Sequence, residues 1–329
     1  MNKAQLYPLR FDLTYQYRIW GGRRLASLLS TPLPGDGPIG EAWVLSDRTD
    51  HQSLVANGAL KGRPLGQVME QFREPLMGKL SSRFRRFPLL LKFLDAHEML
   101  SVQVHPSDDS SELIPAGDTA KTEAWVVIEA EEGSRIYAGL KSGTTAGCLR
   151  ESLHDGTIAE HLVRISPKPG DAVFIPAGTV HSLGDDVVVF EVQQNSDVTF
   201  RLYDWGHIDS ETKELRPLQV EQAFACIRFG ANDSGLVTPI VEATIPAKRD
   251  KLFDCPAFLL WRVLGRDPFP VGAATEPRVL VGIEGSGQIM HNGTSYAVEK
   301  GEVWLLPAEV GECAFQPRGE VTVLEIAVP

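Results

Sequence analysis

Four side chains have the residue types and the spacing of a metal site. Gln103 and His105 lie two residues apart in an alternating stretch rich in β-forming residues. On a strand, both would project from the same face. Glu123 and His181 follow in later strand-like segments. Two imidazoles, a carboxylate and an amide oxygen form a nitrogen and oxygen ligand set typical of a catalytic zinc site, whereas a closed structural site would use cysteines. We therefore predict one zinc ion per chain, although manganese or cobalt could occupy the same ligands.

The segment that carries His181 has a recognisable spacing of turn-forming residues. It reads Gly170, five residues, Pro176, one residue, Gly178, two residues and His181. This spacing resembles the second conserved box of the cupin superfamily, in which a turn delivers the histidine into a small β-barrel. The box usually continues with an asparagine four residues later, but this chain has Asp185 there.

Composition and charge exclude several classes of function. The chain has 329 residues, of which 43% are hydrophobic and 23% are charged, as in ordinary soluble globular proteins. A formal net charge of −11 argues against a nucleic-acid or anionic-membrane partner, because both need a basic surface. The sequence also lacks an apolar run of about 20 residues, the length of a membrane helix, and a secretory signal. We therefore expect a cytoplasmic protein, with its four scattered cysteines reduced.

Strand-forming residues dominate the chain. Short apolar stretches alternate with clusters of Gly, Pro and Asp, the pattern of a mainly β protein. Helical spacing is expected in three places, 65–80, 146–163 with Gly156 as an interruption, and 218–226. The strongest strand signals lie at 42–45, 89–94, 124–128, 172–175 and 187–192.

An internal repeat bears on domain organisation. The stretches 170–177 and 301–308 both read Gly, an acidic residue, apolar residues and Pro-Ala, and each precedes a β-rich stretch. We therefore predict two cupin-type jelly-roll β-barrels, with a few helices inserted in the N-terminal part. Residues 1–235 would form the catalytic domain. Residues 236–329 would form a second domain without metal ligands, because Glu312 stands where the first copy has His181.

Several motifs, taken together and in order, resemble one enzyme family. Over most of the first 210 residues the chain is similar to type I mannose-6-phosphate isomerases (phosphomannose isomerases) of the short bacterial form. Any one motif is weak, whereas the ordered series is strong. The motifs are Arg18-Ile19-Trp20-Gly21-Gly22, Ile39-Gly40-Glu41-Ala42-Trp43, Leu91-Lys92-Phe93-Leu94-Asp95-Ala96, Leu100-Ser101-Val102-Gln103-Val104-His105-Pro106, Lys121-Thr122-Glu123-Ala124-Trp125, the box ending at His181, Glu191-Val192-Gln193-Gln194-Asn195-Ser196-Asp197 and Arg201-Leu202-Tyr203-Asp204-Trp205-Gly206.

The resemblance implies a zinc-dependent interconversion of mannose 6-phosphate and fructose 6-phosphate. It implies that the four residues named first are the zinc ligands and that Arg201 is the catalytic arginine. Lys92, Lys121 and Glu191 would line the substrate pocket. The expected partner is a small sugar phosphate, and the expected state is a monomer or weak homodimer.

The same residues suit this chemistry when they are considered one by one. Isomerisation of an aldose to a ketose needs a cation at the developing oxyanion and a base near the transferred proton. Zinc could act as the Lewis acid, and the planar guanidinium of Arg201 suits an enediolate or phosphate. Lys92 lies within an apolar run, so it must snorkel outward, pair with a carboxylate or line a polar cavity. The base stays open between Glu191 and a lysine whose pKa burial and zinc would lower.

Two other functions are compatible with a cupin sequence. A cupin dioxygenase would use iron, but that class usually has His-x-His where this chain has Gln103-Val104-His105. A sugar-binding or regulatory cupin without catalysis would be expected to have a degraded ligand set. This chain instead retains all four metal positions and Arg201.

Overall fold

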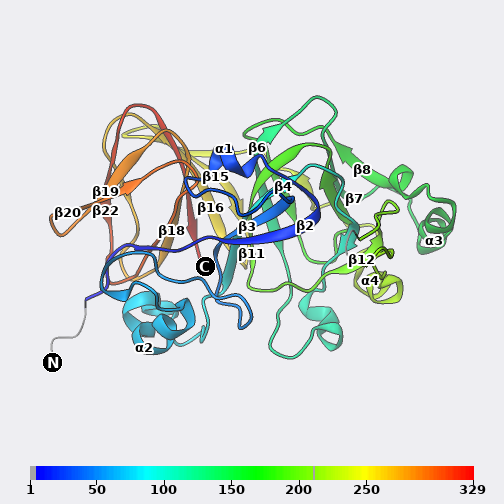
Figure 1. Ribbon diagram of the computed structural model, residues 1–329, viewed down its shortest axis with the longest axis horizontal. Coiled ribbons are helices and arrows are strands. Elements are labelled where there is room, and N and C mark those ends of the chain that lie inside the picture. Colours follow the sequence, from blue (N-terminus) through cyan, green and yellow to red (C-terminus); the bar gives the residue numbers. More distant parts are fainter. Residues whose placement is uncertain (1–4, 210–211) are drawn as a thin grey trace.

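Four antiparallel β-sheets make up most of the molecule (Figure 1). The structure, a computed structural model, describes residues 5–209 and 212–329. We number the sheets I to IV. Sheets I and II pack face to face and form the first sandwich, and sheets III and IV form the second in the same way. Figure 1 shows sheet IV at one end of the molecule and helices α3 and α4 at the other. The mainly β prediction is therefore confirmed.

The first sandwich is built from residues 14–236. Sheet I has the order β12 (Phe200–Tyr203), β5 (Val102–Val104), β10 (His181–Gly184), β7 (Arg135–Leu140), β8 (Leu162–Ile165). Sheet II has the order β13 (Gly235–Leu236), β9 (Ala172–Ile175), β6 (Glu123–Ala130), β11 (Val187–Gln194), β4 (Leu89–Ala96), β2 (Thr14–Gly22), β3 (Ile39–Leu45).

The second sandwich combines the C-terminal residues with one strand from the start of the chain. Sheet III has the order β1 (Leu9–Arg10), β21 (Val303–Leu306), β18 (Arg278–Glu284), β23 (Val321–Ala327), β16 (Leu259–Gly265), β15 (Lys248–Asp254), β14 (Ile240–Ala243). Sheet IV has the order β17 (Phe269–Val271), β22 (Cys313–Pro317), β19 (Gly287–His291), β20 (Thr294–Val298).

The central strands β4 and β11 of sheet II are buried on both faces, which explains their nearly continuous apolar sequences. On β4, Leu89, Leu91 and Phe93 enter a core shared with sheet III, whereas Leu94 and Ala96 face sheet I. The period of two along a strand assigns alternate residues to these two cores. Polar side chains on the face toward sheet I therefore lie inside the first sandwich.

The helices cover edges and ends of the sheets. They are α1 (Leu25–Leu28), α2 (Leu65–Met77), α3 (Ala146–Asp155) and α4 (Val220–Cys226), with 3-10 turns η1 (Gly58–Leu60), η2 (Gly78–Leu80), η3 (Asp108–Leu113) and η4 (Ile158–His161). Helices α2, α3 and α4 match the three predicted helices. The second predicted helix ends early because Gly156 adopts a left-handed φ of 72° as its C-cap. None of the described helices is long and apolar enough to cross a membrane.

The sheets are open in the strand pairings of the described residues, which include no closed barrel. The prediction of two barrels is therefore met only at the level of paired antiparallel sheets. Each sandwich encloses its own apolar core, and a third core joins sheets II and III with α2.

Candidate active site

Strand register brings the predicted site residues together inside the first sandwich. On sheet I, Gln103 of β5 lies opposite His181 of β10 on one side and opposite Arg201 of β12 on the other. On sheet II, Glu191 of β11 lies opposite Lys92 of β4. The two sheets therefore present two polar rows to each other across the interior.

Three buried side chains converge at one point between the sheets. The ligand atoms of His105, Glu123 and His181 all lie within 4.8 Å of one another. Nε2 of His105 is 3.3 Å from Glu123 Oε2, and Nε2 of His181 is 3.2 Å from Glu123 Oε1. Among the described residues, neither oxygen of this carboxylate accepts a hydrogen bond of normal geometry. Buried carboxylate oxygens that lie between two imidazoles and accept no hydrogen bond, with the Lys121 ammonium beside one of them, fit a bound cation.

The backbone fixes the orientation of both imidazole rings. Nδ1 of His105 lies 2.8 Å from the carbonyl oxygen of Val198, and Nδ1 of His181 lies 2.8 Å from that of Thr179. A carbonyl only accepts, so each Nδ1 donates and each Nε2 is directed toward Glu123, where the Nε2 of a neutral ring has a lone pair. Histidines that bind metals usually have this arrangement. Burial, and then Lys121, lower the pKa of His105 to about 3, so the ring is neutral.

Gln103 lies beside these three residues. Its Nε2 is 3.2 Å from His181 Nε2, and its Oε1 accepts a hydrogen bond of 3.3 Å from Ser101. The two ends of an amide have the same shape, so turning it over would present the oxygen to the cluster. The structure thus brings all four predicted ligands together, three of them as the convergent group.

Lys121 supplies the balancing charge next to the cluster. Its Nζ is 2.9 Å from Glu123 Oε2 and 3.1 Å from His105 Nε2. Burial opposes ionisation of Glu123, but Lys121 and His105 outweigh it and hold the pKa of this carboxyl well below its usual range. The cluster therefore contains a neutral His105 imidazole and an ionised carboxylate, the forms that bind a divalent cation.

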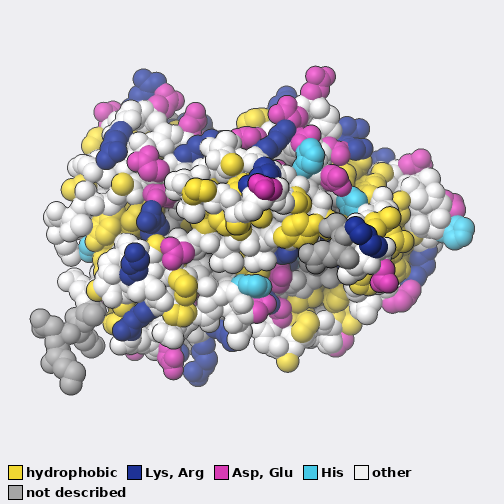
Figure 2. Space-filling view, viewed as in Figure 1, with side chains coloured by type: hydrophobic (Ala, Val, Ile, Leu, Met, Phe, Trp, Pro, Cys, Tyr) yellow, Lys and Arg dark blue, Asp and Glu magenta, His cyan; other side chains and the backbone are white. Residues whose placement is uncertain are grey.

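A cavity of about 280 Å³ opens beside the cluster. Trp20, Trp125 and Leu183 form apolar parts of its wall. The face seen in Figure 2 mixes basic and acidic side chains without one extended basic area. The cavity lining is different, because five of its residues are cationic and three are acidic: Arg18, Lys92, Lys121, Arg201 and Arg216, with Glu41, Glu191 and Asp197. A pocket of this size and composition suits a small polar anion.

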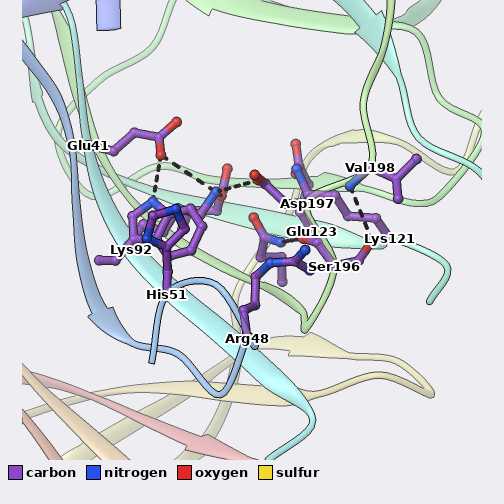
Figure 3. A network of polar contacts seen from close by, with 12 residues as sticks. Glu41, Arg48, His51, Lys92, Lys121, Glu123, Ser196, Asp197 and Val198 are labelled. Atoms are coloured by element: carbon purple, nitrogen blue, oxygen red, sulfur yellow. Dashed lines mark hydrogen bonds and ion pairs between the residues drawn. The ribbon is translucent and has the colours of Figure 1, made fainter. Parts of the chain in front are cut away.

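Lys92 is surrounded by carboxylates (Figure 3). Its Nζ lies 3.8 Å from Glu41, 3.7 Å from Glu191 and 3.6 Å from Asp197, and it also packs over the ring of Trp43. Burial alone would lower the pKa of Lys92, but the three carboxylates raise it above its ordinary value. The expected lowering of a lysine pKa is therefore wrong for Lys92, which stays charged.

Glu191 and Arg201 lie on opposite walls of the cavity. Trp125 Nε1 donates a hydrogen bond of 2.8 Å to Glu191, and burial together with the nearby Glu123 charge raises the pKa of the Glu191 carboxyl. Arg201 Nη1 donates to the carbonyl of Pro217 at 2.9 Å. Within the described part of the chain, the buried Arg201 Nε has no hydrogen-bond partner, and Asp204 Oδ1 lies 3.9 Å from it.

Several cavity residues were missed as functional candidates in the sequence. Glu41 accepts hydrogen bonds from Trp43 Nε1 at 2.6 Å and from two nitrogens of Arg18 at 3.1 Å each. Its position inside an apolar strand was a usable signal, the same one that singled out Lys92. Asp197 and Arg216 lie in loops, where no periodic pattern could have identified them.

Comparison with known proteins assigns this fold and site to a family. Residues 9–127 match the catalytic domain of type I phosphomannose isomerase. The mannose-6-phosphate isomerase ManA of Bacillus subtilis is 35% identical over 319 residues, covering 96% of this chain and 98% of that protein. The mannose-6-phosphate isomerase of Streptococcus mutans is 34% identical over 321 residues, covering 95% and 96%. A crystal structure of the mannose 6-phosphate isomerase from Bacillus subtilis superposes with a TM-score of 0.88 at 28% identity, covering 97% of this chain and 99% of that one.

These full-length similarities confirm the predicted family. The chain belongs to the type I phosphomannose isomerases, a family of aldose–ketose isomerases, in the short bacterial form.

Proposed function

We propose that this protein interconverts mannose 6-phosphate and fructose 6-phosphate through an enediolate, with one zinc ion per chain. The observation that carries the proposal is the convergence of His105, Glu123 and His181 next to a cationic cavity. Gln103 would be the fourth, weaker ligand. When bound, the ion would supply a Lewis acid for the sugar oxygens.

The charges of the cavity suit a sugar phosphate. Arg201 would stabilise negative charge on the enediolate or the phosphate, because its guanidinium is always protonated and offers paired donors. Lys92 and Lys121 would bind substrate oxygens from the opposite sheet, and Lys92 is held for this by its three carboxylates. The apolar walls exclude water, which strengthens each of these interactions.

Glu191 is our candidate for the base. It lines the cavity, it is buried, and its pKa is raised toward the range in which a carboxylate exchanges protons efficiently near neutral pH. In its ionised form it would remove the proton from C2 of the aldose and return it to C1, while the proton of the O2 hydroxyl passes to O1, so that C2 becomes the ketone carbon and C1 the alcohol carbon. The Trp125 indole fixes Oε2 of Glu191, and Oε1, which lies 3.7 Å from Lys92 Nζ, would act on the substrate.

We also propose that the two sandwiches are cupin-type jelly rolls. Residues 1–235 would be the catalytic domain and residues 236–329 the domain without metal ligands. The strand orders of sheets II and III support this division, apart from β1, which joins the second sandwich. A cytoplasmic location and a monomeric or weakly dimeric state remain predictions.

Metal depletion tests the function. Chelation of the purified enzyme is expected to abolish turnover of mannose 6-phosphate in a coupled assay, and zinc is expected to restore it. His105→Ala should lose the ion, whereas His291→Ala, a half-buried histidine of the second sandwich, should keep both the ion and turnover.

Other outcomes would favour the rival functions. Zinc binding without isomerisation of mannose 6-phosphate would support a sugar-binding protein. Purification with iron and no isomerase activity would support a dioxygenase. Full turnover after complete metal removal would contradict the proposed mechanism.

A further inference from the structure

Gln193 is a completely buried amide next to the ligand cluster. It is the penultimate residue of β11, and strand pairing sets it opposite Glu123 on β6. It lies two residues beyond Glu191, so its side chain enters the same interior. A buried polar side chain in such a place needs a reason, because burying an amide is costly unless it forms hydrogen bonds.

The Gln193 amide group fastens the turn that follows its own strand. Nε2 donates a hydrogen bond of 3.0 Å to the carbonyl of Gln194 and a shorter one to the carbonyl of Ser196. These two bonds use both protons of the amide. The turn is closed further by the Ser196 hydroxyl, whose oxygen accepts a bond of 3.4 Å from the backbone of Val198.

This turn carries two groups that act on the site. The carbonyl of Val198 receives Nδ1–H of His105 at 2.8 Å and so sets the direction of Nε2. Asp197, one residue earlier, is one of the three carboxylates around Lys92. Figure 3 shows Ser196, Asp197 and Val198 beside Lys121 and Glu123. If the turn loosened, the His105 imidazole would lose the carbonyl that orients it, and Lys92 would lose one of its three carboxylate partners.

We propose that Gln193 is a positioning residue of the isomerase. Through the turn at 194–198, its amide holds His105 in the metal-binding orientation and Asp197 against Lys92. This inference rests on the proposed metal-dependent function. Groups that orient ligands in this way typically contribute 10- to 100-fold to metal affinity.

Replacement by methionine is a clean test of the amide. Among the described residues, Oε1 of Gln193 has no hydrogen-bond partner, so its removal leaves no donor unsatisfied. Methionine has a similar length and no N–H, and therefore removes only the two bonds to the turn. Gln288→Met is the matched control, because Gln288 also donates one amide bond, of 2.9 Å to Gln316, but lies in the second sandwich.

The measurements are zinc affinity by chelator competition on metal-free protein, and kcat and KM at saturating zinc. Gln193→Met should bind zinc about 10- to 100-fold more weakly than wild type. It should also lose kcat at saturating zinc because Lys92 is displaced, while Gln288→Met matches wild type. Wild-type zinc affinity and kinetics in a folded Gln193→Met would overturn the inference.

A second variant keeps the test decisive if Gln193→Met does not fold. Ser196→Ala removes a weaker closure of the same turn, and it should reduce zinc affinity by a smaller factor. In the double variant, the two losses should be less than additive because both act through one turn. Unchanged zinc affinity in Ser196→Ala, with Gln193→Met unfolded or unchanged, would refute the role. Failure of the wild type itself to bind zinc would instead refute the proposed function.

Discussion

The two sandwiches carry a buried glutamate at the same strand position, but its surroundings differ. In sheet II the strand order β9-β6-β11-β4 holds Glu191 on β11, and in sheet III the order β21-β18-β23-β16 holds Glu325 on β23. The sequences Val187-Val188-Val189-Phe190-Glu191-Val192 and Val321-Thr322-Val323-Leu324-Glu325-Ile326 align residue for residue. Both glutamates point into the interior of their own sandwich.

The two glutamates differ in how their negative charges are balanced by neighbouring groups. Glu325 has its charge matched inside the protein, since Arg249 lies 2.6 Å from it, the Gly272 amide donates at 2.9 Å, and Arg278 lies 4.0 Å away. Arg278 lies two residues before Leu280, the strand neighbour of Glu325, just as Glu123 lies two residues before Trp125 beside Glu191.

The second sandwich thus has a cation, Arg278, where the first has the carboxylate of Glu123, our proposed metal ligand. At the same backbone position, the glutamate of the second sandwich forms an internal ion pair, whereas the glutamate of the first sandwich lines an open, charged cavity. Function therefore follows the side chains around the position more than the fold itself.

The sharpest test of this contrast is a matched pair of substitutions. Glu191→Gln should reduce kcat by about 10²- to 10⁴-fold with little change in stability, because it removes a proposed base. Glu325→Gln should leave kcat unchanged but destabilise the protein by on the order of 2 kcal/mol, because it leaves the partly buried Arg249 and Arg278 without their anion. Steady-state kinetics and denaturant unfolding give the two readings. Equal loss of activity in both variants would remove the distinction between the sandwiches.

The pH dependence sharpens the same comparison. Because the Glu191 pKa is raised and the ionised form is the base, kcat/KM should rise with pH through that pKa on the acid limb. The acid limb should be lost in Glu191→Gln and kept in Glu325→Gln. A pH profile identical in wild type and Glu191→Gln would assign the base to another group.

Arginines offer a second matched pair, with a smaller expected effect. Arg201→Ala should keep zinc but lose about 10²- to 10³-fold in kcat, the usual result of removing one donor to a developing oxyanion. Arg278→Ala should retain kcat and lose stability. Zinc content by metal analysis separates loss of chemistry from loss of the ion. Normal turnover in Arg201→Ala would exclude this residue from the mechanism.

Substitution of Glu41 should have the smallest effect on activity, and its effect on stability should depend on pH. Burial opposes its ionisation, but Lys92 and Arg18 lower its pKa from 4.5 to about 2. The ionised carboxylate therefore contributes stability that is complete above pH about 4.5 and is lost as the pH falls toward 2. Its ion pairs should contribute about 3 kcal/mol at neutral pH. Glu41→Gln should be less stable than wild type at pH 7, and the difference should shrink as the pH falls through this window. A difference independent of pH would contradict the ion-pair origin.

Much of the fold and site could be predicted because local patterns encode them. The short apolar runs at 89–94 and 187–192 predicted strands that the structure confirms as β4 and β11. The i, i+2 spacing of Gln103 and His105, and the turn before His181, placed three of the ligands near one point. The roles of these residues remain predictions.

Other features depend on contacts between distant segments. The partners of Lys92 come from three different segments, so its raised pKa could not be read from its own apolar strand. The Gln193 turn acts through backbone carbonyls, which carry no residue-type signal. The sequence also did not predict that the sheets are open. The repeat at 170–177 and 301–308 indicates related strands but does not indicate whether the edges of a sheet pair with each other.

The first strand of the chain pairs with one made near its end. Leu9 and Arg10 of β1 lie opposite Leu305 and Trp304 of β21, and Figure 1 shows the start of the chain passing beside the C-terminal strands. During synthesis on the ribosome, β1 emerges long before β21 and can pair with it only after β21 has been released. Sheet III is therefore completed late. A truncated chain that ends before β21 would leave β1 without the strand that it pairs with.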